Sequence, residues 1–240
     1  MPADQIKTFS DIDGAWRSAE RESDKRAVWR ALARGGWFHA CRDAVQRNDQ
    51  TTLKAWLDAG DSTRQDILHF AGPEATQLVH AYLRCGLVGC SAREEALQEI
   101  LNHEPGALTF DMPLGFCTDL TLALAGQPLR QAEQNISLSV LLVDTARNEG
   151  VGATLLLELI SGGRGECYAT PELAFLRDTD ARQAEDNARA CVARTGLWQT
   201  AWDVRWQLHR NDGKPLVTLS GPSLGAAFAL GLANLCAARL

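Results

Sequence analysis

The residues best suited to chemistry lie near the carboxyl end, where a serine stands between glycines in Gly221-Pro222-Ser223-Leu224-Gly225. Small neighbours allow a substrate carbonyl to approach a serine closely. An apolar run of helical character follows, and the first turn of a helix leaves backbone N–H groups free to stabilise an oxyanion. We therefore predict Ser223 as a candidate nucleophile, with the backbone of Gly221, Leu224 and Gly225 as its oxyanion site. A helix-capping serine is the alternative.

A serine hydroxyl needs a base to become a strong nucleophile, and this sequence offers few. The seventeen residues after Ser223 include no Asp, Glu or His. The acid and the histidine that should follow a G-x-S-x-G elbow are therefore missing. All four lysines, Lys7, Lys25, Lys54 and Lys214, precede the serine. Lys214, nine residues upstream, is the weak candidate for a base.

The pentapeptide at 221–225 also resembles the Gly-Pro-Ser-x-Gly signature of the Lon-type serine peptidases. The resemblance continues upstream through a Leu-rich strand, a helix and an alternating strand, at 152–160, 181–194 and 203–209. It covers residues 135–240. It implies the amino-terminal portion of a Lon-like proteolytic domain, as in the Lon-like segments of bacterial NACHT-type signalling proteins.

The resemblance implies a Ser–Lys dyad whose lysine follows the serine, but no lysine follows Ser223. Leu224 also replaces the small residue usual after the serine in that family. We therefore expect a Lon-like module without the dyad lysine, serving as a non-catalytic interaction or regulatory domain. The alternative is part of a serine endopeptidase of the Ser–Lys type, with Ser223 as nucleophile and the lysine supplied by another segment or chain.

The elements that must position this segment change in character near Gln134. Apolar residues at helical spacing, interrupted by glycines such as Gly35-Gly36, predict a helical region over residues 1–130. Alternating or continuous apolar runs then predict strands, at 136–143, 153–160 and 200–209. We predict an α+β chain, with a helical N-terminal region followed by a partial Lon-like α/β domain over residues 135–240.

Helices and turns complete this expected domain. Asp178 or Thr179 should cap a helix that runs to Arg194, and a second helix should span Ser223–Ala238. A hairpin turn at 162–165 should pair Cys167–Ala169 with the preceding strand. In the alternating strand, the even positions Trp202, Val204, Trp206 and Leu208 share one face. Together with Trp198, these tryptophans predict core packing, with a peptide-binding aromatic strip as the alternative.

The overall composition narrows the class of protein. The 240 residues are 45% hydrophobic and 22% charged, which is typical of a globular protein, and the formal charge of −6 disfavours nucleic-acid binding. Neither a signal peptide nor a membrane-length apolar run occurs, so we expect a cytoplasmic protein without membrane contact.

Cysteine and histidine spacing bears on metals and cofactors. The seven cysteines are scattered without a C-x-x-C pair and the five histidines form no ligand motif, so we expect reduced thiols, no metal and no cofactor. The last helix is apolar on more than one face, which predicts either a homodimer or tight packing between domains. The expected partner is a protein or peptide.

Overall fold

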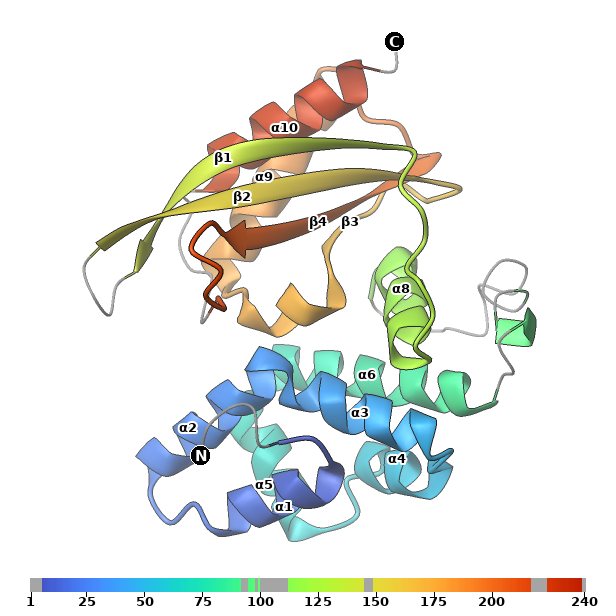
Figure 1. Cartoon of the computed structure of the whole chain (residues 1–240), viewed down its shortest axis with the longest axis vertical. Coiled ribbons are helices and arrows are strands. Elements are labelled where there is room, and N and C mark those ends of the chain that lie inside the picture. Colours follow the sequence, from blue (N-terminus) through green and yellow to red (C-terminus); the bar gives the residue numbers. More distant parts are fainter. Residues whose placement is uncertain are drawn as a thin grey trace. The chain divides into compact units, whose positions relative to one another are not determined.

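The computed structural model describes residues 6–91, 95–97, 99, 112–144, 149–216 and 224–238. The chain divides into two units, residues 1–129 and residues 130–240 (Figure 1). The first unit is helical in its described part, and the second combines helices with a four-stranded mixed sheet. The α+β class with N-terminal helices is therefore confirmed.

The helices of the first unit are short and follow one another closely. They are α1 (Phe9–Arg17), α2 (Glu22–Ala31), the π-turn η2 (Leu32–Gly36), α3 (Trp37–Gln46), α4 (Gln50–Leu57), α5 (Ser62–Ala71), α6 (Pro73–Ser91) and α8 (Leu114–Leu124). Side-chain caps set several boundaries, because a cap satisfies an N–H group that the helix leaves unpaired. Asp49 accepts from the Thr52 backbone at 3.0 Å, and Asp61 accepts from the Arg64 backbone at 2.9 Å.

Aromatic rings fill the core of this unit. Trp37 and Trp56 are fully buried and pack edge to face, with ring centroids 5.6 Å apart. Phe9 lies 5.2 Å from Trp56, so it joins α1 to α4. The predicted stop at Gly35-Gly36 takes the form of a kink without an intervening loop, because Gly35 adopts a φ of 127° and α3 begins at Trp37.

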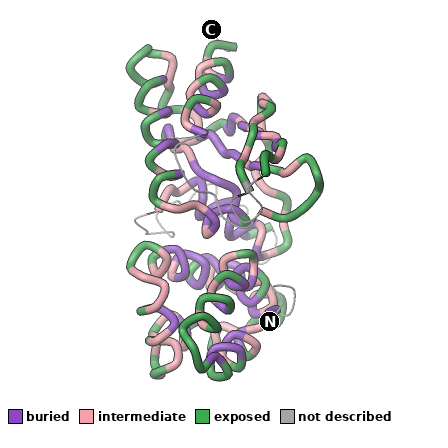
Figure 2. Tube along the Cα trace, turned by 90° about the vertical axis from the view of Figure 1, so that its left-hand side faces the viewer, coloured by how far each residue is buried: buried purple, intermediate pink, exposed green. Residues whose placement is uncertain are grey.

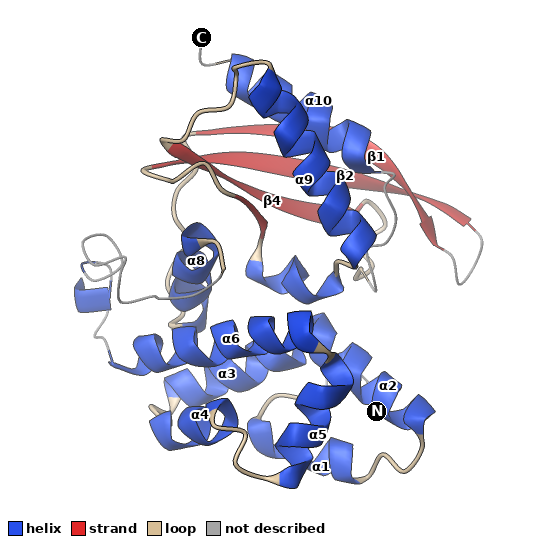
Figure 3. Cartoon of the chain, turned by 180° about the vertical axis from the view of Figure 1, so that it is seen from behind, coloured by secondary structure: helices blue, strands red, loops and turns tan. Residues whose placement is uncertain are grey.

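The second unit contains the sheet and two long helices. Its elements are β1 (Gln134–Asp144), β2 (Glu149–Ser161), β3 (Cys167–Ala169), the 3₁₀ turn η4 (Pro171–Leu176), α9 (Thr179–Arg194), β4 (Trp202–Arg210) and α10 (Gly225–Ala237). The strand order is β1-β2-β4-β3; β1–β2 and β2–β4 are antiparallel and β3–β4 is parallel. Helices α9 and α10 lie side by side on one face of the sheet (Figure 3).

Alternation along the strands divides the sheet into a buried and a polar face. The predicted row Val204, Trp206 and Leu208 is buried beneath the helices, where Trp206 packs edge to face on Phe228 at 5.0 Å. Figure 2 shows the buried positions concentrated along the strands and the inner sides of the helices in each unit. The opposite face carries ionic pairs, including Arg205 Nε to Glu158 Oε2 at 2.9 Å.

The predicted hairpin between the second strand and Cys167–Ala169 is wrong. These three residues pair in parallel with β4, which lies between β2 and β3. The loop at 162–165 therefore crosses the end of β4 instead of forming a tight turn. The predicted helices at 178–194 and 223–238 correspond to α9, capped by Asp178, and to α10 over its described residues.

Within the described part of the second unit, helix α10 is covered on two sides. It packs on β1 and β2 beneath it and on α9 beside it, whereas Leu230 remains 58% exposed. The predicted homodimer or packing between domains, which would cover this exposed side, stays a prediction. None of the described helices has the length and apolar character needed to cross a membrane.

Candidate functional site

The predicted serine site falls partly outside the described residues. Ser223 and Gly221 belong to the undescribed range 217–223. Leu224 is buried directly before α10, and Gly225 is its first residue. A Cβ at Gly225 would lie 3.6 Å from the Ala184 side chain, an ordinary contact distance, so the start of α10 lies next to α9. The roles assigned to these residues stay predictions.

Lys214 lies in the turn after β4 and is 56% exposed. Its ammonium Nζ is 3.7 Å from Asp212 Oδ2, and its backbone N–H donates to Asp212 Oδ1 at 3.1 Å. Hydrogen bonds, chiefly from Arg210, lower the pKa of Asp212, so this partner stays a carboxylate. A lysine becomes a base through burial in apolar surroundings or through a neighbouring cation. Lys214 is exposed and lies beside an anion, so it has neither of these surroundings.

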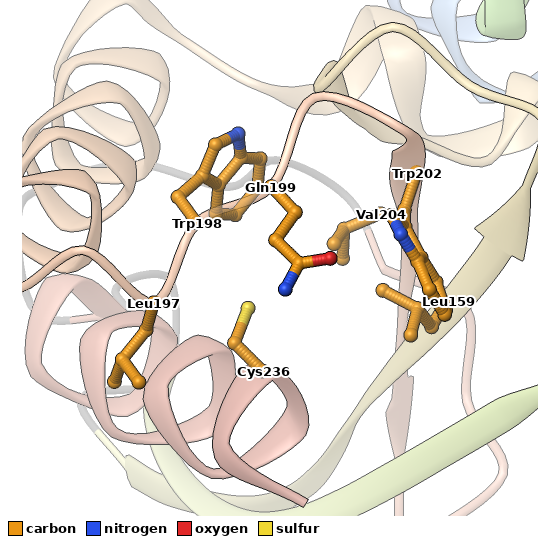
Figure 4. Close-up of a pocket in the computed structure, with 7 residues that line it drawn as sticks. All are labelled: Leu159, Leu197, Trp198, Gln199, Trp202, Val204 and Cys236. Atoms are coloured by element: carbon orange, nitrogen blue, oxygen red, sulfur yellow. The ribbon is translucent and has the colours of Figure 1, made fainter. Parts of the chain in front are cut away.

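A pocket lined mainly by apolar groups opens at one end of the second unit. Its cavity volume is about 20 Å³, and its mouth is open to solvent. Its lining residues are Leu159, Leu197, Trp198, Gln199, Trp202, Val204 and Cys236. Figure 4 shows the loop after α9 contributing one wall, the strands contributing the opposite wall, and the Cys236 sulfur directed from α10 into the space between. The pocket therefore joins three segments that are distant in sequence: Leu159 of β2, residues 197–204, and Cys236 of α10.

Local chain geometry explains why the pocket forms at this end. Helix α9 ends at Arg194, and Gly196 adopts a φ of 76°, which turns the chain back towards β4. The returning loop presents Trp198. Trp202 is the first residue of β4 and lies on the same face as the buried row that includes Trp206. Because α10 supplies only its last turn here, Trp202 remains half-buried at the pocket wall.

The loop at 162–166 supports Trp198. The Trp198 indole Nε1 donates to the Gly165 carbonyl at 3.3 Å. Gly165 has a φ of 77°, and a Cβ there would lie 3.2 Å from the same Nε1 atom. Glycine at this position therefore permits both the turn and the close approach of the indole.

A buried carboxylate holds this loop in place. Asp203 is 2% exposed, and its Oδ1 accepts from the backbone of Arg164 at 2.8 Å and of Glu166 at 3.1 Å. Its Oδ2 lies 3.4 Å from the Arg130 guanidinium, which also donates to the Tyr168 hydroxyl. A Cβ at Gly163 would lie only 2.3 Å from the Asp203 backbone nitrogen. Asp203 therefore holds the loop through hydrogen bonds, and the loop in turn holds the Trp198 indole through the Gly165 carbonyl.

The pocket is electrically neutral. No charged side chain lines it, and Gln199 is its one amide side chain. Burial raises the pKa of the Cys236 thiol, so this group is uncharged at neutral pH. Such a pocket favours apolar and aromatic groups and gives no compensation for a buried charge.

A second buried cluster lies beneath α9. Glu185 Oε2 accepts from Arg177 Nη1 at 2.6 Å, and the Arg177 guanidinium stacks 5.5 Å from the Trp206 ring centroid. Burial raises the pKa of Glu185, and the Arg177 charge opposes that rise. Burial also raises the pKa of the Cys167 thiol well above its ordinary value, with the adjacent Glu185 adding to the effect. This cluster fixes η4 against α9 and the sheet.

No metal site was predicted, and none is visible in the described ranges. Among those residues, no group of three or more His, Cys, Asp and Glu side chains could hold a metal ion. The chain matches no family model, no curated protein and no solved structure. The resemblance to Lon-type peptidases consequently rests on the chain's own residues.

The structure separates the three tryptophans that the sequence placed together. Trp206 is a core residue, as predicted, whereas Trp198 and Trp202 line the pocket. Sequence reasoning missed the contributions of Leu159 and Cys236, because only the sheet register and the path of α10 bring them to this end. The available signal was a tryptophan two residues after the helix stop at Gly196.

Proposed function

We propose that this chain is a Lon-like, non-catalytic interaction module whose second unit binds an apolar side chain of a protein partner. The observation that carries the proposal is the pocket between Trp198 and Trp202. Half-buried indoles supply large contact areas with little conformational freedom to lose, which is typical of binding hot spots. A neutral lining selects an apolar anchor over a charged one.

The pocket suits a side chain better than a free small molecule. Its cavity volume of about 20 Å³ is far below the roughly 300 to 1,000 Å³ of small-molecule sites. Such sites also fix their ligands with several placed polar groups, whereas here Gln199 is the one lining amide and the Trp198 indole N–H already donates to the Gly165 carbonyl. Contacts of the partner's backbone and flanking residues with the surface around the pocket can orient the bound side chain, which the pocket's own polar groups do not.

Two further observations support the non-catalytic Lon-like reading. Lys214 is exposed and lies beside Asp212, so it lacks the surroundings that activate a lysine. The order β2, α9, β4 and α10 agrees with the strand, helix, strand and helix that the resemblance implies. All seven cysteines are free, which supports a cytoplasmic location as part of the same proposal.

A displayed peptide library selected on the full chain tests this function. Selected peptides should share one large apolar residue, because burying such a side chain contributes about 2 kcal/mol, or roughly 30-fold in affinity. Trp198→Ala should weaken their binding at least tenfold. Trp29→Ala is the matched control, because Trp29 is a half-buried tryptophan of the first unit. Peptides without an apolar anchor, or equal binding by both variants, would refute the proposal.

A further inference from the structure

Strand β1 is a long edge strand without the usual protection against pairing. It spans eleven residues at one end of the strand order, so its outer side has no neighbouring strand in the described part of the chain. Residues 134–143 contain no charged residue and no proline. Leu141 is 71% exposed and Val143 is 65% exposed. Edge strands of monomeric proteins are normally blunted by charge, proline or short length, and β1 has none of these features before its last residue, Asp144.

Helix α10 follows the same edge. A Cβ at Gly231 would lie 2.8 Å from Leu138 Cδ1 of β1 and 2.5 Å from Leu157 Cδ1 of β2, so the helix runs above this strand pair. Figures 1 and 3 show α10 next to β1, with α9 on its other side. Helical periodicity places Ala227 and Asn234 opposite the side that meets α9. The sheet edge and the helix flank therefore form one continuous uncharged surface.

We propose that a second copy of this chain binds this surface through antiparallel pairing of the two β1 strands. The dimer would contain one continuous sheet across a twofold axis. Because Ser139 is the midpoint of β1, a twofold axis there aligns the strand with its copy over its full length. On the helix-covered face, Leu138 then meets Val140 of the second copy, and Ile136 meets Leu142. On the other face, Ser139 meets its own equivalent.

The spacing of the layers fits a second copy. Neighbouring strands lie about 4.8 Å apart. In the dimer the strands would follow in the order β2-β1-β1-β2. If α10 lies midway between β1 and β2 in each copy, the two α10 axes are separated by two strand spacings, about 10 Å. Packed helices have interaxial distances of about 8 to 10 Å. Small side chains such as Ala227 on the facing flank permit that approach, and exposed Leu230 lies next to it. Strand pairing and helix packing are thus satisfied together.

The contact area of the proposed dimer is also sufficient for a stable interface. An eleven-residue strand is about 37 Å long, and a thirteen-residue helix is about 20 Å long. With each layer about 10 Å thick, the contact covers roughly 600 Å² per copy. Stable interfaces begin at about 600 Å² per partner. The absence of charge over residues 134–143 also matters, because each copy carries a net charge of −6 and a neutral contact avoids close repulsion.

Sedimentation equilibrium of the full chain tests the dimer. We expect a mass of about twice 26.2 kDa at micromolar concentration. Ser139→Lys should raise the dimer dissociation constant at least tenfold, because two ammonium groups would face each other at the twofold axis. Ser161→Lys makes the same change at the exposed end of β2, beyond the paired length of β1, and should leave the dimer intact. Circular dichroism would show that both variants fold.

A crosslink tests the register directly. Directly opposed residues of antiparallel strands have Cα atoms about 4.5 to 5.5 Å apart, within the range that a disulfide requires. In a Cys191→Ser background, Ser139→Cys should yield a covalent dimer under mild oxidation, and Ser161→Cys should not. A monomeric wild-type chain, or a dimer that Ser139→Lys leaves unchanged, would overturn the proposal. Trp198→Ala should not alter dimer formation, so this test is independent of the pocket.

Discussion

Replacement of Gly163 by alanine tests the connection between Asp203 and the pocket. An added Cβ would lie 2.3 Å from the Asp203 backbone nitrogen and 2.4 Å from its Oδ1. Neighbouring backbone bonds restrain the loop, from Gly163 N to Ala201 O at 3.1 Å and from Gly165 N to Trp202 O at 2.9 Å. The clash is with backbone and with a buried carboxylate, so rotation of a flexible side chain cannot relieve it.

The magnitude follows from what must move. If the loop shifts, Asp203 loses the two backbone donors at 2.8 and 3.1 Å. Hydrogen bonds to a charged group contribute about 1.5 to 3 kcal/mol each. If the loop stays, overpacking costs about 1 to 3 kcal/mol. We therefore expect Gly163→Ala to lower the free energy of unfolding of the second unit by about 3 kcal/mol.

Gly162→Ala provides a matched control. Gly162 has a φ of 71° with nothing within 4 Å of an added Cβ. Its substitution should cost about 1 kcal/mol, from backbone strain alone. Urea unfolding followed by hydrogen exchange of peptides from residues 150–216 would report the second unit apart from the first. Equal destabilisation by the two substitutions would refute the role assigned to Asp203 and its loop.

The remaining predictions concern pH, catalysis and a helix cap. Burial raises the pKa of Glu185, so its contribution to stability is present below the unfolded pKa and is lost as pH rises through the folded pKa. In urea unfolding from pH 4 to 8, the midpoint of Glu185→Gln should therefore rise relative to the wild-type midpoint as pH rises, whereas that of exposed Glu172→Gln should not. A difference between Glu185→Gln and wild type that stays constant with pH would contradict this. A fluorophosphonate probe should label wild type and Ser223→Ala equally weakly, and strong labelling abolished by that substitution would show an activated serine. Asp178→Ala should destabilise α9 by about 1 kcal/mol, measured by exchange of amides at 179–186, and unchanged exchange there would show that the cap contributes nothing.

Local patterns in the sequence were sufficient to predict most of the secondary structure. Alternation at 202–208 gave the buried row of β4, because a strand with one packed face requires a period of two. Asp178 or Thr179 was predicted to cap the helix that runs to Arg194, and Asp178 caps it, because its short acidic side chain satisfies a free N–H group of the first turn. These signals are local, so one sequence reveals them.

Pairing partners could not be predicted in the same way. The order β2-β4-β3 depends on Asp203 holding the loop at 162–166, a contact between residues about forty positions apart. The residues around Gly163 in the sequence do not indicate that it packs against the carboxylate and the backbone nitrogen of Asp203. The pocket likewise depends on where α10 ends above the sheet, since Cys236 and Leu159 meet only in the folded chain.

Fluorine NMR of the chain labelled with 5-fluorotryptophan tests the central claim most directly. The seven tryptophans give separate reporters in both units, and Trp→Phe variants assign the signals. On addition of a peptide selected for an apolar anchor, the signals of Trp198 and Trp202 should shift in a saturable manner. Those of buried Trp37 and Trp56, in the first unit, should stay unchanged. Saturable binding that leaves Trp198 and Trp202 unshifted would contradict the account.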